Sequence, residues 1–212
     1  SSIVLSIMAI IVSIKSYQIS NRQYESDLFD KVPDFEIIQT QIQNPENNLY
    51  EEAYLSISKI SGKAKNIDIE IATFFDVTYM KDNKQKIFQF IVPDYYNTNY
   101  KTGKTEGEIQ ESTGYRNQKQ LHIFQKQLDS LTKKQDIIYG NLKSFVRIKY
   151  LNFENKSVSC YYEVNLFGGN YIDSIIGKKR FENYHNLYRT NKIIDLSNPN
   201  ASNKVSYMNS KF

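Results

Sequence analysis

The chain opens with a stretch that is apolar on every side of a helix. The run from Ile3 to Ile14 reads IVLSIMAIIVSI and has two serines as its only polar residues, a pattern that suits lipid or a fully buried helix. A polar stretch follows from Lys15, and Val32-Pro33 ends the helix, because the residue before a proline avoids the α region. The pattern predicts a long N-terminal helix with an apolar first half and a polar stalk.

We expect the apolar half to anchor the protein in a membrane as a single span. Twelve residues cover only about 18 Å of a bilayer core of about 30 Å, so a full span needs further apolar residues before Ser1. Lys15, Arg22 and Lys31 follow the run and favour a cytoplasmic location for the rest of the chain. A core helix and a signal-peptide remnant are the alternatives. The expected anchor residues are Ile3, Val4, Leu5, Ile7, Met8, Ile10, Ile11, Val12 and Ile14.

A partner helix is the alternative to lipid as the surface that covers this segment. Ile10, Tyr17 and Tyr24 recur every seven residues. The d-type positions that would complete a seam with them are mostly polar, so this spacing does not predict a coiled coil.

From Phe35 onward, apolar and polar residues alternate in several segments that are rich in β-branched and aromatic side chains, as in half-buried strands. Two pairs of these segments flank short polar connections, which predicts two hairpins. The predicted strands are Phe35–Ile42, Tyr54–Ile60, Ile67–Tyr79, Lys86–Val92, Phe145–Phe153 and Val158–Phe167.

The remaining segments carry weaker patterns. Pro93–Asn117 is long, polar and glycine-containing, so we expect a connection between sheets. The apolar spacing in Leu121–Leu131 predicts an amphipathic helix. Tyr171–Tyr188 is interpreted as a helix or an irregular edge, and the residues after Asp195 as a weakly ordered tail.

Two hairpins and at least two further strands, without strand-helix-strand repeats, predict a mainly β fold. We expect an antiparallel β-sandwich, immunoglobulin-like in the broad sense, with one packed amphipathic helix. The predicted organisation is a membrane-associated helix and stalk over 1–32, the β-sandwich over 33–195, and the tail over 196–212.

The order of an apolar helix, a polar stalk (SYQISNRQYE) and a strand that begins PDFEI resembles small uncharacterised single-span bacterial membrane proteins with a β-rich domain. The resemblance covers roughly the first forty residues as a pattern rather than a specific motif, on the same hydropathy argument as the anchor. It implies no known activity.

Composition excludes several kinds of site. The 212 residues carry 27 basic and 23 acidic side chains, a net charge of +4 that neither demands nor excludes nucleic acid. Cys160 is the single cysteine, which rules out an internal disulfide and a multi-cysteine zinc site. With only His122 and His185, a histidine-based metal centre or triad is poorly supplied, and no cofactor is predicted.

Other candidate residues have equally plain interpretations. Thr102-Gly103-Lys104-Thr105 resembles the end of a phosphate-binding loop, but Thr98 stands where the first glycine belongs and no apolar helix follows. Cys160 is interpreted as a strand thiol rather than a nucleophile. The acidic residues Glu106, Glu108 and Glu111 are given no roles.

One group combines cations with aromatic rings, the ingredients of a contact with phosphates and bases. It contains Lys178, Lys179, Arg180 and Arg189 with Phe181, Tyr184 and Tyr188. A solvated edge or a contact with anionic lipid explains it equally well. We therefore expect a membrane-tethered, non-enzymatic binding or assembly module with a protein partner. The alternatives are a nucleic-acid-facing component, for example of a phage-defence system, and a hydrolase whose carboxylates converge only in the fold.

Overall fold

The computed structural model describes residues 2–29, 31–81, 84–131, 137–166, 168–203 and 205, and for 2–9, 25–29, Lys81 and Ile137 it describes the backbone alone. Its strands form two antiparallel sheets. One sheet, called sheet A, has the order β1-β2-β6-β5; its strands are β1 (Asp34–Gln43), β2 (Tyr50–Ser61), β6 (Gly107–Thr113) and β5 (Thr98–Lys101). The other, sheet B, has the order β4-β3-β7-β8-β9; its strands are β4 (Lys84–Ile91), β3 (Lys65–Lys81), β7 (Ile137–Leu151), β8 (Ser157–Asn165) and β9 (Gly168–Ile172).

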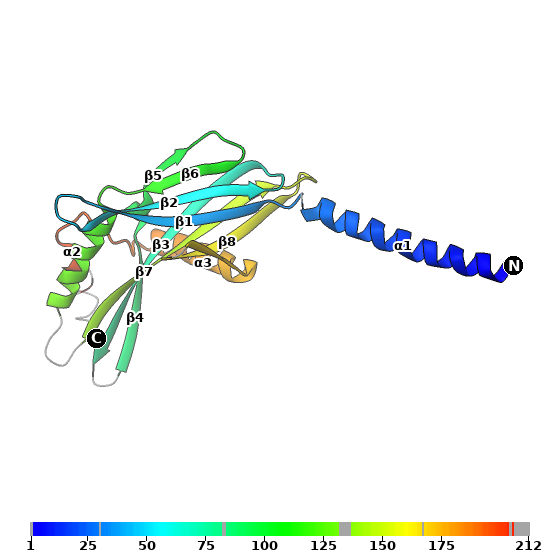
Figure 1. The fold of residues 1–212 in the computed structure, drawn as a ribbon. Helices are drawn as coiled ribbons and strands as arrows, with labels where there is room; N and C mark the ends of the chain where they lie inside the picture. The colour runs from blue at the N-terminus through cyan, green and yellow to red at the C-terminus, as the bar shows by residue number, and fades with distance from the viewer. Residues whose placement is uncertain are drawn as a thin grey trace.

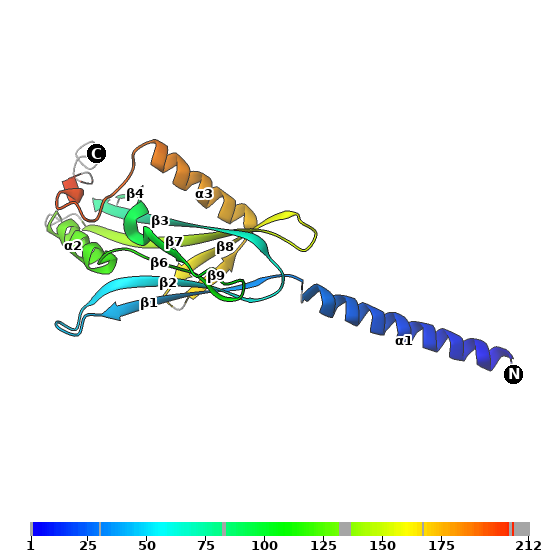
Figure 2. The same ribbon diagram turned by 90° about the horizontal axis from the view of Figure 1, so that it is seen from above.

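Helices lie at three places around these sheets (Figures 1 and 2). Helix α1 (Ser2–Phe29) projects away from the sheets in both views. Helix α2 (Asn117–Ser130) lies at the end of the sheets far from α1, beside the short helix η1 (Pro93–Tyr96). Helix α3 (Ser174–Arg189) packs along sheet B.

The main hydrophobic core lies between the two sheets. Alternation along each strand sends every second side chain inward. Leu55 on β2, Phe75 on β3 and Ile148 on β7 are all fully buried in the same cluster. Phe124 of α2 joins them and stacks edge to face on Phe75, with ring centroids 5.2 Å apart. The helix therefore covers the end of the core and belongs to it.

A second, smaller core lies on the outer face of sheet B. Phe74 and Phe145 point to this side, and Phe181 and Tyr184 of α3 pack on them. The helix begins where the Asp173 carboxylate accepts hydrogen bonds from the first backbone N–H groups of α3, which satisfies donors that have no partner inside a helix. Around Phe74 and Phe145, sheet B is thus covered on both faces.

One side of the gap between the sheets is closed by β1 and β9. A side-chain carbon added at Gly169 on β9 would collide with the Ile37 side chain on β1, so only glycine permits this approach. The sheets therefore meet at these two edge strands.

The structure confirms the prediction of a mainly β chain with two antiparallel sheets and a few helices. Both predicted hairpins are present, as β3–β4 and β7–β8, although Asp82, Asn83 and Phe167 lie outside the described residues. The segment predicted as a long connection instead contains η1, β5 and β6. The main core also continues past residue 195 through Leu196, Ala201 and Val205.

The prediction of a single-pass membrane segment with a cytoplasmic domain is wrong. Among the helices that the structure describes, none combines the length and the apolar character needed to cross a bilayer. The physical reason is that the apolar run from Ile3 stops at Ile14, and α1 continues with Lys15, Arg22 and other polar residues. The nine residues expected to form an anchor therefore make up only the first part of a helix whose second part is polar.

Candidate functional site

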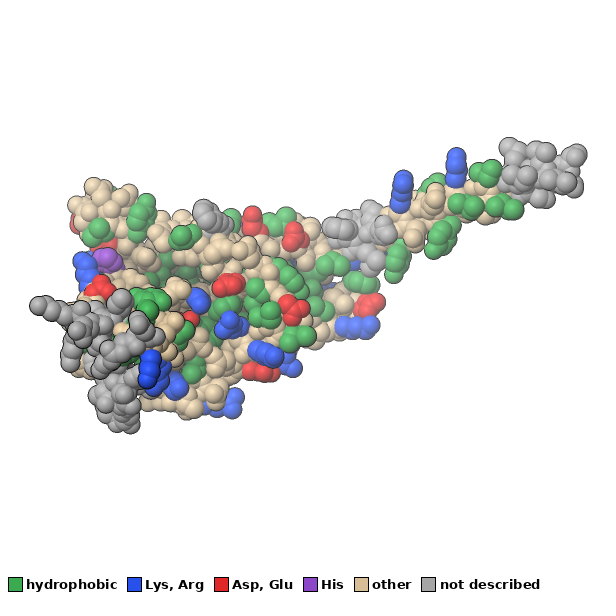
Figure 3. All heavy atoms as spheres, turned by 90° about the horizontal axis from the view of Figure 1, so that it is seen from below, with side chains coloured by type: hydrophobic (Ala, Val, Ile, Leu, Met, Phe, Trp, Pro, Cys, Tyr) green, Lys and Arg blue, Asp and Glu red, His purple; other side chains and the backbone are tan. Residues whose placement is uncertain are grey.

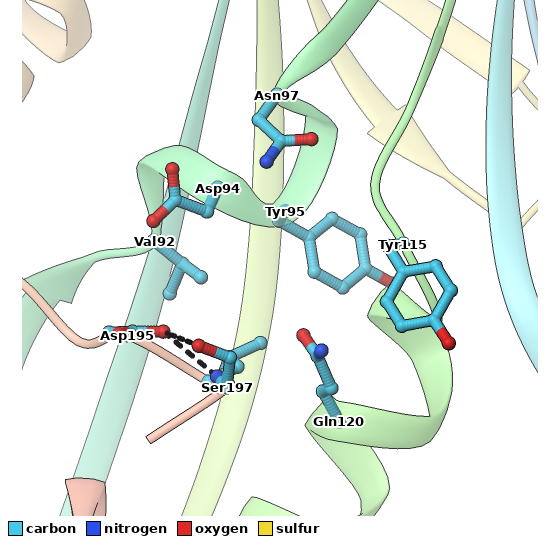
Figure 4. A pocket seen from close by; sticks show the side chains of 9 residues that line it. Val92, Asp94, Tyr95, Asn97, Tyr115, Gln120, Asp195 and Ser197 are labelled. Carbon is cyan, nitrogen blue, oxygen red and sulfur yellow. Dashed lines mark hydrogen bonds between the residues drawn. The ribbon is translucent and has the colours of Figure 1, made fainter.

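A cavity of about 400 Å³ opens at the end of the sheets opposite α1. Its walls come from η1, from the start of α2 and from the segment after α3 (Figure 4). The lining residues are Val92, Asp94, Tyr95, Asn97, Tyr115, Gln120, Asp195, Leu196 and Ser197. We call this cavity the end pocket.

Asn117 holds two of these walls together. Its side chain is 1% exposed. Its Oδ1 accepts a hydrogen bond from Ala53 N at 2.7 Å, and its Nδ2 donates to Ala53 O at 3.0 Å and to Tyr95 O at 2.8 Å. One amide thus joins α2, β2 and η1 by satisfying backbone groups that have been removed from water.

Glu51 fixes the same end of α2 by charge. Its carboxylate lies 2.9 Å from Lys119 Nζ and 3.5 Å from Arg116 Nε, and it accepts a hydrogen bond from Asn47 Nδ2 at 3.0 Å. The hydrogen bonds from Lys119 and Asn47 lower the pKa of Glu51 from 4.5 to about 2. The side chain is nearly buried at the head of β2, so this cluster positions α2.

Polar side chains that line the end pocket form hydrogen bonds within the chain. Asp195 Oδ1 accepts hydrogen bonds from Ser197 N at 2.9 Å and Ser197 Oγ at 2.6 Å, so this carboxylate shapes its own turn (Figure 4). Tyr95 donates its hydroxyl proton to Gln118 Oε1 at 2.7 Å, and burial raises its pKa. Neither histidine nor cysteine lines this cavity, and no cluster of metal-ligating side chains occurs among the described residues.

The structure separates the cations and the rings of the predicted anionic-partner patch, all of which lie on α3. Phe181 and Tyr184 are buried against sheet B and are therefore unable to stack on a base. The cations Lys178, Lys179, Arg180 and Arg189 are exposed, and of the rings Tyr188 is exposed as well.

Some of these cations have partners within the chain. Arg180 lies over the Phe145 ring at 5.5 Å, and Lys178 lies 4.0 Å from Glu182 one helical turn away. The group is thus a solvated helix face with one ring at its end.

Cys160, His185 and His122 lie in three different surroundings. Burial raises the pKa of Cys160 to about 11, and its thiol donates to Ile148 O at 3.5 Å. His185 Nε2 lies 3.2 Å from Glu70, whose other oxygen pairs with Arg147. His122 is exposed on α2. The structure does not bring these three residues together.

The acidic residues between 106 and 111 do not converge either. Glu106 pairs with the buried Lys59 at 3.6 Å. Glu108 accepts a hydrogen bond from Ser56 at 2.7 Å, and Glu111 lies opposite Ser56 in the register of β2 and β6. Within the described residues, these carboxylates lie on the surface of sheet A and do not face one cavity.

The described part of α1 presents an extended apolar surface. Ile10, Val12, Ile14 and Ile19 are each more than half exposed, and Tyr17 is 70% exposed. Figure 3 shows hydrophobic side chains along the described part of the helix, together with basic ones. The domain does not cover them.

Sequence reasoning missed the residues that build the end pocket. Asn117 is one polar residue in a polar stretch, and its partners Ala53 and Tyr95 are 64 and 22 positions away. The only local signal was its place directly before the apolar stripe of α2. Comparison with known protein families and with curated proteins found no matching family model and no similar curated protein.

Proposed function

We propose that this protein is a non-enzymatic assembly module that self-associates through α1, the helix that its two-sheet domain presents. The observation that carries the proposal is a heptad seam of apolar residues along α1, whose described side chains are exposed. The two sheets share one core, which supports treating the domain as a β-sandwich that is immunoglobulin-like in the broad sense and rigid enough to present a helix.

The seam emerges when the seven-residue repeat is counted from Ile7. The first positions of the repeat are then Ile7, Ile14, Asn21 and Leu28, and the fourth positions are Ile3, Ile10, Tyr17 and Tyr24. This alternation of three- and four-residue steps is the a/d pattern of a coiled coil. Counting with Ile10 in the first position places serines at the fourth position and hides the seam.

The described part of the seam is open to solvent. Ile10 and Ile14 are 59% and 53% exposed, and Tyr24 is 62% exposed. The positively charged Lys15 and Arg22 occupy the b positions, outside the seam, where a coiled coil tolerates charge. The domain leaves these side chains exposed to water, so only a partner surface could bury them.

The occupant we assign is α1 of a second copy, aligned in parallel. Burying an apolar side chain removes roughly 60–120 Å² from water, so seven apolar seam positions on each of two helices bury roughly 800–1,700 Å². Stable interfaces bury about 1,200–2,000 Å². Asn21 at an a position is buried at low cost only opposite another Asn, and two copies in parallel register provide that partner.

A pair of matched substitutions tests the proposal. The full chain should elute from size-exclusion chromatography with light-scattering detection at twice its mass of 24.9 kDa. Ile14→Glu, in the seam, should shift about 100 μM protein to the monomer, because two like charges would face each other in the interface. Ile19→Glu makes the same change at an f position that is 57% exposed and should leave the mass unchanged.

Disulfide cross-linking tests how the two α1 helices are aligned. Tyr24→Cys, at a d position, should form a disulfide between two copies under mild oxidation, whereas Arg22→Cys, at a b position, should not. Equal cross-linking at both positions, or a monomeric unsubstituted chain at about 100 μM, would refute the seam.

A further inference from the structure

A second cavity, of about 330 Å³, lies at the α1 end of the domain, between the start of β3 and the loop that joins β5 to β6. It exists because β4 pairs with β3 only from Phe74 onward. Within the described residues, Lys65–Ala72 of β3 pair with β7 along one edge and with no strand along the other. The gap between the sheets is therefore open on this side.

Three exposed lysines are among the residues that line this cavity, which we call the lysine pocket. They are Lys65 on β3, Lys101 at the end of β5, and Lys104 in the following loop. None of the residues that line it is acidic. Across the described part of the chain, the three ammonium groups have no hydrogen-bond or ion-pair partner.

One neighbouring lysine is already paired within the chain. Lys59, the next lysine toward the core, donates to Gly62 O at 2.7 Å and lies 3.6 Å from Glu106. The carboxylate nearest in sequence to Lys104 is thus engaged elsewhere. An anion in this cavity would be attracted by the positive charge of the three pocket lysines.

The wall of the lysine pocket is apolar. Ile67 and Ile69 are half-buried side chains that pack on the main core, and Ile109 is 7% exposed. A cavity of about 300–1,000 Å³ with apolar walls and a few polar groups is the usual form of a small-molecule site. The lysines and the apolar wall would therefore match a ligand that has a negatively charged head and a hydrocarbon body.

Hydrogen bonds within the chain fix the conformation of the loop that carries Lys104. Thr102 Oγ1 donates to Glu108 O at 2.6 Å and accepts from Lys104 N at 3.3 Å. Gly103 has φ +74°, a conformation that favours glycine. A hairpin strand follows this segment, so it is not a phosphate-binding loop of the nucleotide type, whose anion site needs a helix N-terminus.

We propose that the lysine pocket binds a small organic anion that consists of a carboxylate or phosphate head and a short hydrocarbon body. The head pairs with the ammonium groups of Lys65, Lys101 and Lys104, and the body lies on Ile67, Ile69 and Ile109. This site is independent of the α1 seam, so either proposal stands without the other.

Isothermal titration calorimetry of the full chain with three probes tests the assignment. Octanoate supplies both parts of the ligand, octan-1-ol has the hydrocarbon without the charge, and acetate has the charge without the hydrocarbon. Octanoate should bind at least tenfold more tightly than either, and its affinity should fall as salt rises from 20 to about 300 mM, because salt screens exposed charges. Comparable binding of octan-1-ol would show an unspecific apolar surface and overturn the proposal.

Two matched variants distinguish octanoate binding at this site from nonspecific attraction to positive charge. K65Q/K101Q/K104Q should weaken octanoate binding at least tenfold. K178Q/K179Q/R189Q neutralises the same number of exposed cations on α3 and should leave it unchanged. Retained binding in the first variant, or an equal loss in both, would refute the proposal. Because all six side chains are exposed, unchanged melting temperatures verify that both variants fold.

Discussion

Asn117→Ala should be among the most destabilising single changes in the domain, because it removes an amide that serves three structural elements at once. The alanine cannot replace the hydrogen bonds to Ala53 N and Tyr95 O. Ala53 O keeps a partner, since Thr113 Oγ1 also donates to it at 3.3 Å. Two buried backbone groups therefore lose a partner, and the part-buried Gln118 N, which donates to Asn117 Oδ1 at 2.8 Å, loses this acceptor as well.

The expected magnitude follows from that count. Each buried polar group left without a partner costs about 1–3 kcal/mol, so Asn117→Ala should lower the free energy of unfolding by about 2–6 kcal/mol. Whole domains are stable by only about 5–15 kcal/mol. At about 2–4 °C per kcal/mol for a domain of this size, the melting temperature should fall by about 4–24 °C.

Urea denaturation followed by circular dichroism measures this change directly. Asn97→Ala is the matched control, because Asn97 is exposed and accepts only a 3.2 Å hydrogen bond from the neighbouring Thr98; it should change stability by less than about 0.5 kcal/mol. Asn117→Asp should not rescue stability, since a carboxylate cannot donate to Ala53 O and Tyr95 O. A loss below about 1 kcal/mol in Asn117→Ala would refute the account of the amide.

Two further predictions concern α2 and α3. The pKa of Glu51 is lowered to about 2 in the folded state, so its stabilising contribution is complete above pH 4.5 and is lost as pH falls toward 2; Glu51→Gln should flatten the stability profile in that window, and an unchanged slope would contradict the assignment. Gly177 lies against Tyr161 with no room for a side-chain carbon, so Gly177→Ala should destabilise the protein by about 1–3 kcal/mol, whereas Asn186→Ala on the exposed face of α3 should not.

The sequence was sufficient for the strands whose alternation is apolar. Phe145–Phe153 and Val158–Phe167 were predicted as a hairpin, and β7 and β8 pair there from Ser144↔Val164 to Leu151↔Ser157. The stripe of Leu121, Phe124 and Leu128 was also reliable, because all three side chains are buried. In these segments the apolar positions of the local pattern are mostly the positions that the core buries.

The sequence was insufficient where polar side chains face inward. In β6 the buried Gln110 donates to Ser112 Oγ at 3.0 Å and to Asn99 Oδ1 at 3.3 Å, so the strand has a polar interior row that hydrophobic alternation does not detect. No strand was predicted after Phe167, but Gly168-Gly169 begins β9, where the close approach to Ile37 requires glycine. Both cases depend on partners that are distant in the sequence.

The same limit applies to the candidate sites. Lys65, Lys101 and Lys104 come from two sheets, and only the Lys104 segment carried a recognisable signal. The spacing of Ile10, Tyr17 and Tyr24 did not by itself predict a coiled coil, and the seam that we propose on α1 uses a different phase of the seven-residue repeat. The exposure of its described side chains in the structure supports that proposal.

The junction between α1 and β1 determines how the domain responds to a pulling force. Helix α1 leaves the domain where β1 begins, and both views show it continuing away from that strand (Figures 1 and 2). The β1–β2 ladder extends from Asp34↔Ser61 to Gln43↔Tyr50, with its hydrogen bonds perpendicular to the strands. Tension transmitted along α1 would therefore load that whole row in shear rather than open it bond by bond, so the attachment resists pulling as a unit.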